Sequence, residues 1–307
     1  MKIALLDLGT NTFHLLLAEV KDGIPNVLTN RKIAVKIGQG GIVKGLITEA
    51  AQERAVSALK EYARIIETEK AEVVFATATS AIRNAKNGRQ LVERIYRATG
   101  IVVRIISGDE EASYIYEGIK TALDIGDTTS MIMDIGGGSV EFIICNGEKI
   151  FWKESFEIGA QRLLDHFHSS DPMKEEEIKK LNQYLDTQLQ SLERAIKEYN
   201  PTILIGASGS FDTVAEINCQ MNGTVFHGAH RELDLKLEEY EKIHNQIVGS
   251  TKEERLKIPG MIEMRVDMIV VACCLIQFIL KLQQPDKIRV STASLKEGLL
   301  SIAIRNI

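Results

Sequence analysis

Two stretches of the sequence carry the same pattern, an acidic residue followed by small turn-forming residues. Asp7 begins the segment Asp-Leu-Gly-Thr-Asn-Thr at 7–12, and Asp134 begins Asp-Ile-Gly-Gly-Gly-Ser at 134–139. Gly, Asn, Ser and Thr tolerate unusual backbone angles and leave N–H groups pointing outward. Two such turns facing each other would hold a phosphate chain from two sides, with the two Asp carboxylates placed to hold a cation. We therefore predict an enzyme that acts on phosphates.

A single turn of this kind most often joins two strands and binds nothing. The duplication favours phosphate binding, because each turn is followed by a second strand, another turn and a third strand. The residues predicted to contact phosphate are Gly9, Thr10, Asn11 and Thr12 in the first turn and Gly136, Gly137, Gly138 and Ser139 in the second.

A third glycine-rich segment, Gly-Ala-Ser-Gly-Ser at 206–210, follows a predicted strand at 202–205 and opens a predicted helix at 211–217. The N-terminus of a helix offers free N–H groups and a positive dipole end to an anion. The segment matches neither the Walker loop nor the dinucleotide fingerprint, and a tight corner between strand and helix is the alternative. Beside the other two turns, phosphate contact is favoured for Ala207, Ser208, Gly209 and Ser210.

Several charged residues could carry the chemistry. The acidic residues at 109–111 begin a predicted helix where a strand at 101–106 ends, and ligands of α/β sheets collect at strand ends. A carboxylate there could take a proton from water attacking a phosphoryl group, although acidic residues also complement the dipole of a helix's first turn. Glu141 shares a strand face with Ser139 and needs a cation or water to hold. Arg83 follows another predicted strand and is either a bidentate phosphate ligand or a surface charge.

The elements that must position these residues alternate in the same order in both halves. Each half is predicted to form three strands and then helix, strand, helix, strand and helix. This βββαβαβα repeat predicts a duplicated α/β fold whose parallel strands are joined through helices, with a cleft between the two domains. The predicted domains are residues 1–123 with the C-terminal helix 293–307, and residues 124–292.

The hydrophobic periodicity indicates where the individual elements lie. The apolar residues of 174–199 recur every three or four positions, which predicts one long helix. That helix could serve as a homodimer surface, and packing on its own domain is the favoured interpretation. The remaining predicted elements are helices at 49–70, 89–99, 110–123 and from 293 onward, and strands at 72–78, 101–106, 202–205 and 287–291.

Composition narrows the class of protein. The 307 residues carry a net charge of −5, so no global field attracts polyanions, and nucleic-acid binding is disfavoured. The four cysteines form no CxxC pair and indicate reduced core residues in a cytoplasmic protein. The N-terminus has no export signal, and the longest apolar run, 269–280, falls short of the ~20 residues of a membrane span. His227 and His230 have no nearby third ligand, so zinc binding is not expected.

Six short segments of the sequence, taken together and in order, resemble the motif set of the exopolyphosphatase / guanosine pentaphosphate phosphatase (Ppx/GppA) family in its short two-domain form. The resemblance covers essentially the whole chain and implies the actin-like ATPase (ribonuclease H-like) fold. The matching segments are DLGTNTFH (7–14), ATSAIR (78–83), ISGDEEA (106–112), DIGGGSVE (134–141), GASGS (206–210) and SLKEGLL (294–300).

The resemblance implies a role for individual residues. Glu111 would be the general base for water, and Arg83 would contact the phosphoryl group being cleaved. Asp134 and Glu141, together with Asp7, would hold Mg²⁺ or Mn²⁺. The three glycine-rich turns would cradle the phosphates.

The implied activity is the release of orthophosphate from the terminal phosphoanhydride of inorganic polyphosphate. Hydrolysis of the 5′-phosphate of guanosine pentaphosphate is the alternative, and a non-catalytic sensor of such nucleotides is a further one. An actin-like kinase would use the same turns on ATP. Two departures from the family pattern are the Thr at positions 10 and 12 in place of Ser and Lys296 in place of Arg. The chain also ends without the C-terminal domains of long family members, which puts processivity on long polyphosphate in doubt.

Overall fold

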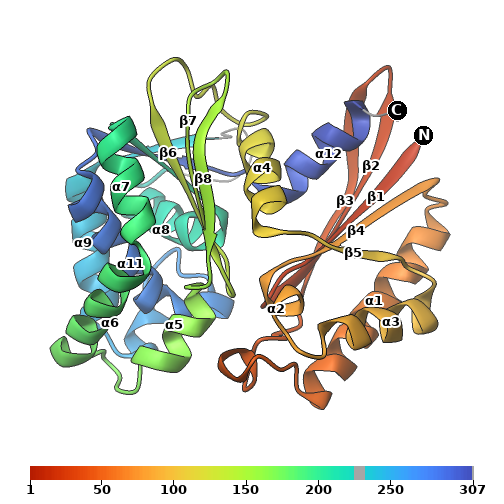
Figure 1. Cartoon of the computed structure of the whole chain (residues 1–307), viewed down its shortest axis with the longest axis horizontal. Coiled ribbons are helices and arrows are strands. Elements are labelled where there is room, and N and C mark those ends of the chain that lie inside the picture. The colour runs from red at the N-terminus through yellow and green to blue at the C-terminus, as the bar shows by residue number, and fades with distance from the viewer. Residues whose placement is uncertain (225–231, 306–307) are drawn as a thin grey trace. The chain divides into compact units, whose positions relative to one another are not determined.

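The computed structural model describes residues 1–224 and 232–305, so the loop containing His227 and His230 lies outside the described residues. The chain divides into two compact units (Figure 1). The first is Met1–Gly118 with Leu295–Ile307, and the second is Ile119–Ser294. No helix in the described part of the chain is long and apolar enough to cross a bilayer.

The first unit is built on a five-stranded sheet with the strand order β3-β2-β1-β4-β5. Strands β1, β2 and β3 form an antiparallel meander, and β4 and β5 run parallel to β1. These strands are β1 (Lys2–Leu8), β2 (Thr12–Lys21), β3 (Ile24–Ala34), β4 (Val73–Ala78) and β5 (Val103–Ile105).

Helices cover this sheet because consecutive residues of its central strands β1 and β2 are apolar and buried. Leu6, Phe13 and Leu59 belong to one buried cluster, which lies between the sheet and the neighbouring helices α1 and α3 (Figure 1). Helix α12 packs against β1. The helices of the unit are α1 (Glu49–Thr68), α2 (Ser80–Arg83), α3 (Gly88–Thr99), α4 (Gly108–Ile119) and α12 (Leu295–Arg305), with a 3-10 turn η1 (Ile42–Lys44).

The second unit is built on a six-stranded sheet with the order β10-β11-β9-β6-β7-β8. Its strands are β6 (Ser130–Ile135), β7 (Val140–Cys145), β8 (Ile150–Phe156), β9 (Ile203–Ala207), β10 (Glu232–Leu235) and β11 (Lys287–Ser291). Its helices are α5 (Ala160–Phe167), α6 (Glu175–Gln188), α7 (Gln190–Tyr199), α8 (Ser208–Met221), α9 (Leu237–Gly249), α10 (Lys252–Arg255), η2 (Glu263–Arg265) and α11 (Met268–Gln283).

The two sheets repeat one plan, which confirms the predicted duplicated α/β fold. In each unit an antiparallel three-stranded meander comes first, and a later strand then pairs in parallel with the first strand, β4 with β1 and β9 with β6. Asp7 and Asp134 therefore occupy corresponding places near the end of the first strand of their units. This agrees with the actin-like fold that the resemblance implied.

The predicted long helix 174–199 is wrong in one respect, because the structure contains two helices that meet at Leu189. The backbone leaves the helical region there, with φ −101° and ψ 20°. Leu185, Leu189 and Leu192 are nevertheless all buried in one core, so the apolar spacing continues across the break. Periodicity alone could not reveal it. The helix predicted at 110–123 ends at Ile119, and the short edge strand β10 was not predicted.

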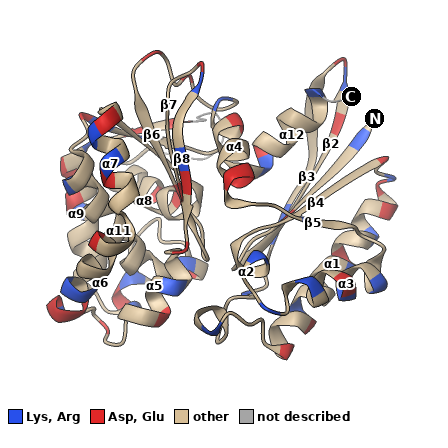
Figure 2. Cartoon of the chain, viewed as in Figure 1, with Lys and Arg blue, Asp and Glu red and all other residues tan. Residues whose placement is uncertain are grey.

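Both signs of charge occur together on several helices of each unit. Figure 2 shows Lys and Arg interspersed with Asp and Glu along outward helices such as α1 and α3 in one unit and α6 and α9 in the other. All four cysteines are free thiols and buried, and burial raises the pKa of Cys145 to about 12. Cys145 is therefore a protonated core residue at neutral pH, as the sequence suggested.

Candidate functional site

The structure brings Glu111 and Arg83 together as a buried ion pair. The Arg83 Nη1 donates to Glu111 Oε2 at 2.7 Å, and the two side chains are only 15% and 8% exposed. The same Nη1 also donates to the Ile106 carbonyl at 3.3 Å, which fastens the guanidinium to the end of β5. Because a buried carboxylate is costly unless it is paired, this contact stabilises Glu111 and fixes its position.

Neighbouring strand ends explain why these two residues meet. The Thr79 N–H donates to the Leu8 carbonyl, and the Ile106 N–H donates to the Ala78 carbonyl. The ends of β1, β4 and β5 therefore lie side by side. The turn at 9–12 leaves the first strand, Arg83 follows the second and Glu111 follows the third.

The three acidic residues at the start of α4 differ sharply in their surroundings. Asp109 is exposed, whereas Glu111 is buried against Arg83. Glu110 caps the helix, because its carboxylate accepts hydrogen bonds from the Ser107 N–H and hydroxyl at 2.9 and 3.1 Å. The backbone bond from Ser107 is the largest cause that lowers the pKa of Glu110. Glu110 is thus a structural residue, and Glu111 is the one of the three that pairs with Arg83.

In the second unit, Asp134 on β6 and Glu141 on β7 lie directly opposite each other across an antiparallel pair. Both are buried, at 5% and 2% exposure. The Ser155 hydroxyl donates to Glu141 Oε1 at 2.7 Å, and the Ser294 hydroxyl donates to Asp134 Oδ2. Like charges opposite each other in a sheet repel, so positive charge near this pair stabilises it.

The two acidic turns also share their local geometry. A Cβ placed on Gly9 would come within 2.9 Å of the Thr12 carbonyl oxygen, and one on Gly136 within 2.9 Å of the Ser139 carbonyl oxygen. Both distances are shorter than real side chains allow. The same position of each turn therefore requires glycine, for the same steric reason.

The third turn differs from its prediction in length. Helix α8 begins at Ser208 rather than at 211, and Ser208 itself has φ +66°. A non-glycine residue in this left-handed region costs about 1–3 kcal/mol and is typical of functional corners. The N-cap residue Ala207 makes no side-chain cap bond. Because Ala207 pairs with Asp134 in the sheet, the N-terminus of α8 lies beside that carboxylate.

Arg265 is a site residue that sequence reasoning missed. Its guanidinium lies against Gly209, where an added Cβ would be 1.5 Å from Nη2. Burial lowers the pKa of Arg265, and the carboxylates of Asp212 and Asp134 oppose that shift. The cation thus faces both the start of α8 and one of the two buried acids. Arg265 stands between Met264 and Val266, outside any recognisable motif, so the sequence gives no reason to assign it to a site.

Replacing Gly209 by Ala is expected to lower kcat/KM for a phosphate substrate by about 10- to 100-fold, because misplacement of a binding group by about 1 Å can cost that much. The new methyl group would displace Arg265 from the start of α8. Steady-state kinetics of orthophosphate release test this. Gly249→Ala is the control, since nothing lies within 4 Å of a Cβ at Gly249. Equal activity of the two variants would contradict a role for Arg265 at this corner.

Asp134 and Glu141 fit a hard divalent cation. Mg²⁺ usually takes one or two carboxylates and completes its shell with substrate phosphates and water. Within residues 1–224 and 232–305 no three His, Cys, Asp or Glu side chains form a ready metal cluster. Among the described residues of the second unit, the two opposed carboxylates could supply one or two of the oxygen ligands of such an ion. Asp7 belongs to the first unit, and its role as a ligand stays a prediction.

Comparison with known proteins places these features in a family. The model of the Ppx/GppA phosphatase family matches residues 16–305. An exopolyphosphatase crystal structure from Cytophaga hutchinsonii is 46% identical with a TM-score of 0.95, covering 100% of this chain and 99% of that one. The Aquifex aeolicus family member is 27% identical with a TM-score of 0.82, covering 100% and 98%. Exopolyphosphatase 1 of Mycobacterium leprae is 24% identical over 98% of this chain and 88% of that protein.

Proposed function

Because the chain belongs to the Ppx/GppA phosphatase family, we propose that it is a hydrolase that releases orthophosphate from the terminal phosphoanhydride of inorganic polyphosphate. The observation that carries this proposal is the buried pair of Glu111 and Arg83 beside the turn at 9–12. It supplies a held carboxylate and a cation at the end of a sheet, where ligands of α/β proteins bind. Relatives that are named exopolyphosphatases support polyphosphate as the substrate.

In the proposed reaction Glu111 accepts a proton from water as the water oxygen attacks the terminal phosphorus. The bond from that phosphorus to the bridging oxygen breaks, and the bridging oxygen stays on the shortened chain. Arg83 has five N–H donors, so it can contact Glu111 and a phosphoryl oxygen together. It would thereby set the distance between the base and the phosphorus. In phosphoryl transfer, positioning and charge stabilisation supply most of the catalysis.

The remaining site residues would bind the negative charge of the chain. Backbone N–H groups of the turns at 9–12, 137–139 and 207–210 would donate to phosphate oxygens, and Arg265 would add a cation near the third turn. The Gly136 N–H is not among them, because it donates to the Ser139 carbonyl at 3.0 Å. Asp134 and Glu141, with Asp7, would hold Mg²⁺ or Mn²⁺. That ion, when bound, supplies charge neutralisation for the transferred and leaving oxygens.

Hydrolysis of the 5′-terminal phosphate of guanosine pentaphosphate would use the same residues and is the alternative substrate within the family. A non-catalytic nucleotide sensor is less well supported. Such a sensor gains little from Glu111, Asp134 and Glu141 beside a bound phosphate, and burying each carboxylate has a cost.

The experiment that separates these functions measures orthophosphate release, with Mg²⁺, from long polyphosphate, tripolyphosphate, guanosine pentaphosphate and ATP. We expect the highest kcat/KM on a polyphosphate. A higher value on guanosine pentaphosphate would transfer the protein to the nucleotide branch of the family. If the protein binds these compounds but releases orthophosphate from none of them, the hydrolase proposal fails and the sensor interpretation replaces it.

A further inference from the structure

The carbonyl side of the second glycine-rich turn is held by the segment that leads into α5. Three consecutive carbonyl oxygens, those of 136–138, accept hydrogen bonds from three consecutive backbone N–H groups, those of 159–161. The bonds are Ala160 to Gly136 at 2.9 Å, Gln161 to Gly137 at 2.9 Å and Gly159 to Gly138 at 3.2 Å.

Fixing these carbonyls also fixes the direction of the N–H groups of the turn. In a trans peptide the C=O and N–H bonds of one plane point in opposite directions. Holding the carbonyls of 136–138 on one side therefore turns the N–H groups of 137–139 to the other side. Those are the N–H groups proposed to bind phosphate.

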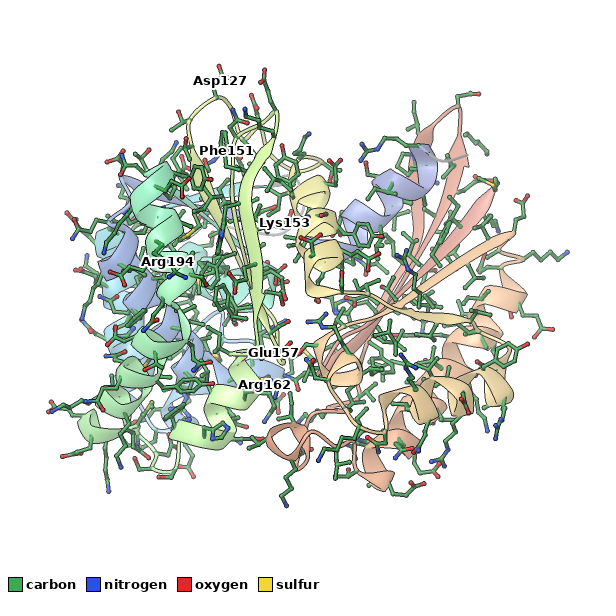
Figure 3. All side chains as sticks on the ribbon, viewed as in Figure 1. Asp127, Phe151, Lys153, Glu157, Arg162 and Arg194 are labelled. Atoms are coloured by element: carbon green, nitrogen blue, oxygen red, sulfur yellow. The ribbon has the colours of Figure 1, made fainter. Side chains whose placement is uncertain are left out.

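Arg162 adds a side-chain bond to the same support. Its Nε donates to the Gly138 carbonyl at 2.8 Å, so this oxygen accepts from both Gly159 and Arg162. The Arg162 Nη2 donates to Glu157 Oε2 at 3.0 Å, and the Arg162 side chain is 16% exposed. Figure 3 shows Glu157 and Arg162 close together where β8 leads into α5.

The close approach of the two segments depends on Gly159. A Cβ at this position would lie 2.5 Å from backbone atoms of Gly137 and Gly138, which no real side chain tolerates. The support and the turn are therefore matched to each other, with glycine on both sides of the contact.

The first unit has a similar backbone contact that holds the carbonyls of its own acidic turn. After β3, the N–H groups of Lys36 and Gly38 donate to the carbonyls of Asn11 and Thr10 at 2.8 and 3.2 Å. Arg54 then donates from Nε and Nη2 to the carbonyls at 35 and 36. In both units, the segment after the third strand holds the carbonyls of the acidic turn, and an Arg fastens the contact. In the second unit that Arg binds the turn itself.

We propose that Arg162 is a positioning residue, which holds the turn at 136–139 so that its N–H groups face the bound phosphate. This inference rests on the proposed function, because it assigns phosphate to that turn. Arg162 acts through the Gly138 carbonyl and does not touch substrate. The contact with Glu157 orients Arg162 and is secondary, since partly exposed ion pairs contribute little.

The test compares Arg162→Ala, Glu157→Gln and Arg194→Ala. Loss of a hydrogen bond from a charged group changes an equilibrium constant by about 10- to 100-fold. Arg162→Ala should therefore lower kcat/KM for tripolyphosphate by about that factor. Glu157→Gln should change it less than about threefold. Arg194→Ala is the matched control, because Arg194 is exposed on α7 and lies apart from Arg162 (Figure 3). Added guanidinium ion should partly restore Arg162→Ala and leave Arg194→Ala unchanged.

A second measurement does not depend on catalysis. Amide hydrogen exchange across 136–142 should be faster in Arg162→Ala than in wild type and unchanged in Glu157→Gln, with exchange in α7 unaltered in both. Unchanged kinetics together with unchanged exchange in Arg162→Ala would overturn the inference, as would a Glu157→Gln variant that reproduces Arg162→Ala. If wild type released no orthophosphate, the proposed function would fail while the exchange comparison still decided the role of Arg162.

Discussion

Replacing Glu111 by Gln is expected to lower kcat for orthophosphate release by about 10²- to 10⁴-fold, which is the usual contribution of a general base. The amide keeps the size of the side chain and can still accept a hydrogen bond from Arg83, but it cannot take a proton from water. KM should change little, because the turns and cations that bind phosphate stay in place. Steady-state kinetics on tripolyphosphate measure both constants.

The neighbouring acidic residue provides the control. Asp109 is two positions away on the same helix turn but exposed, so Asp109→Asn should retain wild-type kcat. The thermal midpoint of each variant checks that the fold is intact. A loss of less than tenfold in Glu111→Gln, or an equal loss in Asp109→Asn, would remove Glu111 from its assigned role.

Replacing Glu141 by Gln is expected to lower kcat by at least about 100-fold and to raise the Mg²⁺ concentration needed for half-maximal activity. Replacing a residue that only supports a metal ligand typically lowers metal affinity or activity by about 10- to 100-fold, and replacing a direct ligand should lower them more. The physical reason is the buried opposition of Asp134 and Glu141, which a cation would relieve. Chelation of divalent ions should abolish orthophosphate release by wild type.

Thermal stability gives a readout of the same site without substrate. A ligand that binds only the folded state raises its stability, so Mg²⁺ should raise the melting temperature of wild type and have little effect on Glu141→Gln. Glu154→Gln is the control, because Glu154 pairs with Phe142 and so lies on the opposite face of the sheet from Glu141. An identical response to Mg²⁺ in wild type and Glu141→Gln would show that the cation binds elsewhere.

Most of the architecture could be predicted from the sequence because its signals are local and repeated. Short apolar runs mark the strands, and the acidic turns mark where strands end, so the repeated βββαβαβα order is visible without tertiary information. The sequence placed Glu141 on the same strand face as Ser139, and the structure adds that the hairpin at 136–139 sets Glu141 opposite Asp134. The confirmed fold rests on these features.

One missed feature is a local break in a helix, and two others depend on contacts between distant segments. Leu189 breaks a helix without interrupting its apolar spacing, because the residues on both sides pack into one core. Arg265 reaches the start of α8 from a short 3-10 turn with no motif around it. The pairing of Arg83 with Glu111 requires β4 and β5 to be neighbours, which the spacing along the chain does not fix.

The sequence identified which residue types could carry the chemistry, and the structure separates their surroundings. At the start of α4, the sequence does not distinguish three acidic side chains. In the structure Asp109 is exposed, Glu110 caps the helix and Glu111 is buried against Arg83.

The most direct test of the central claim is hydrolysis of tripolyphosphate in water enriched in oxygen-18. Attack of water on the terminal phosphorus places one heavy oxygen in the released orthophosphate and none in the pyrophosphate that remains, and we predict that result for wild type, with both products nearly absent in Glu111→Gln. Heavy oxygen in the pyrophosphate would mean attack on the inner phosphorus. That outcome, or turnover that leaves Glu111→Gln as active as wild type, would contradict the proposed mechanism.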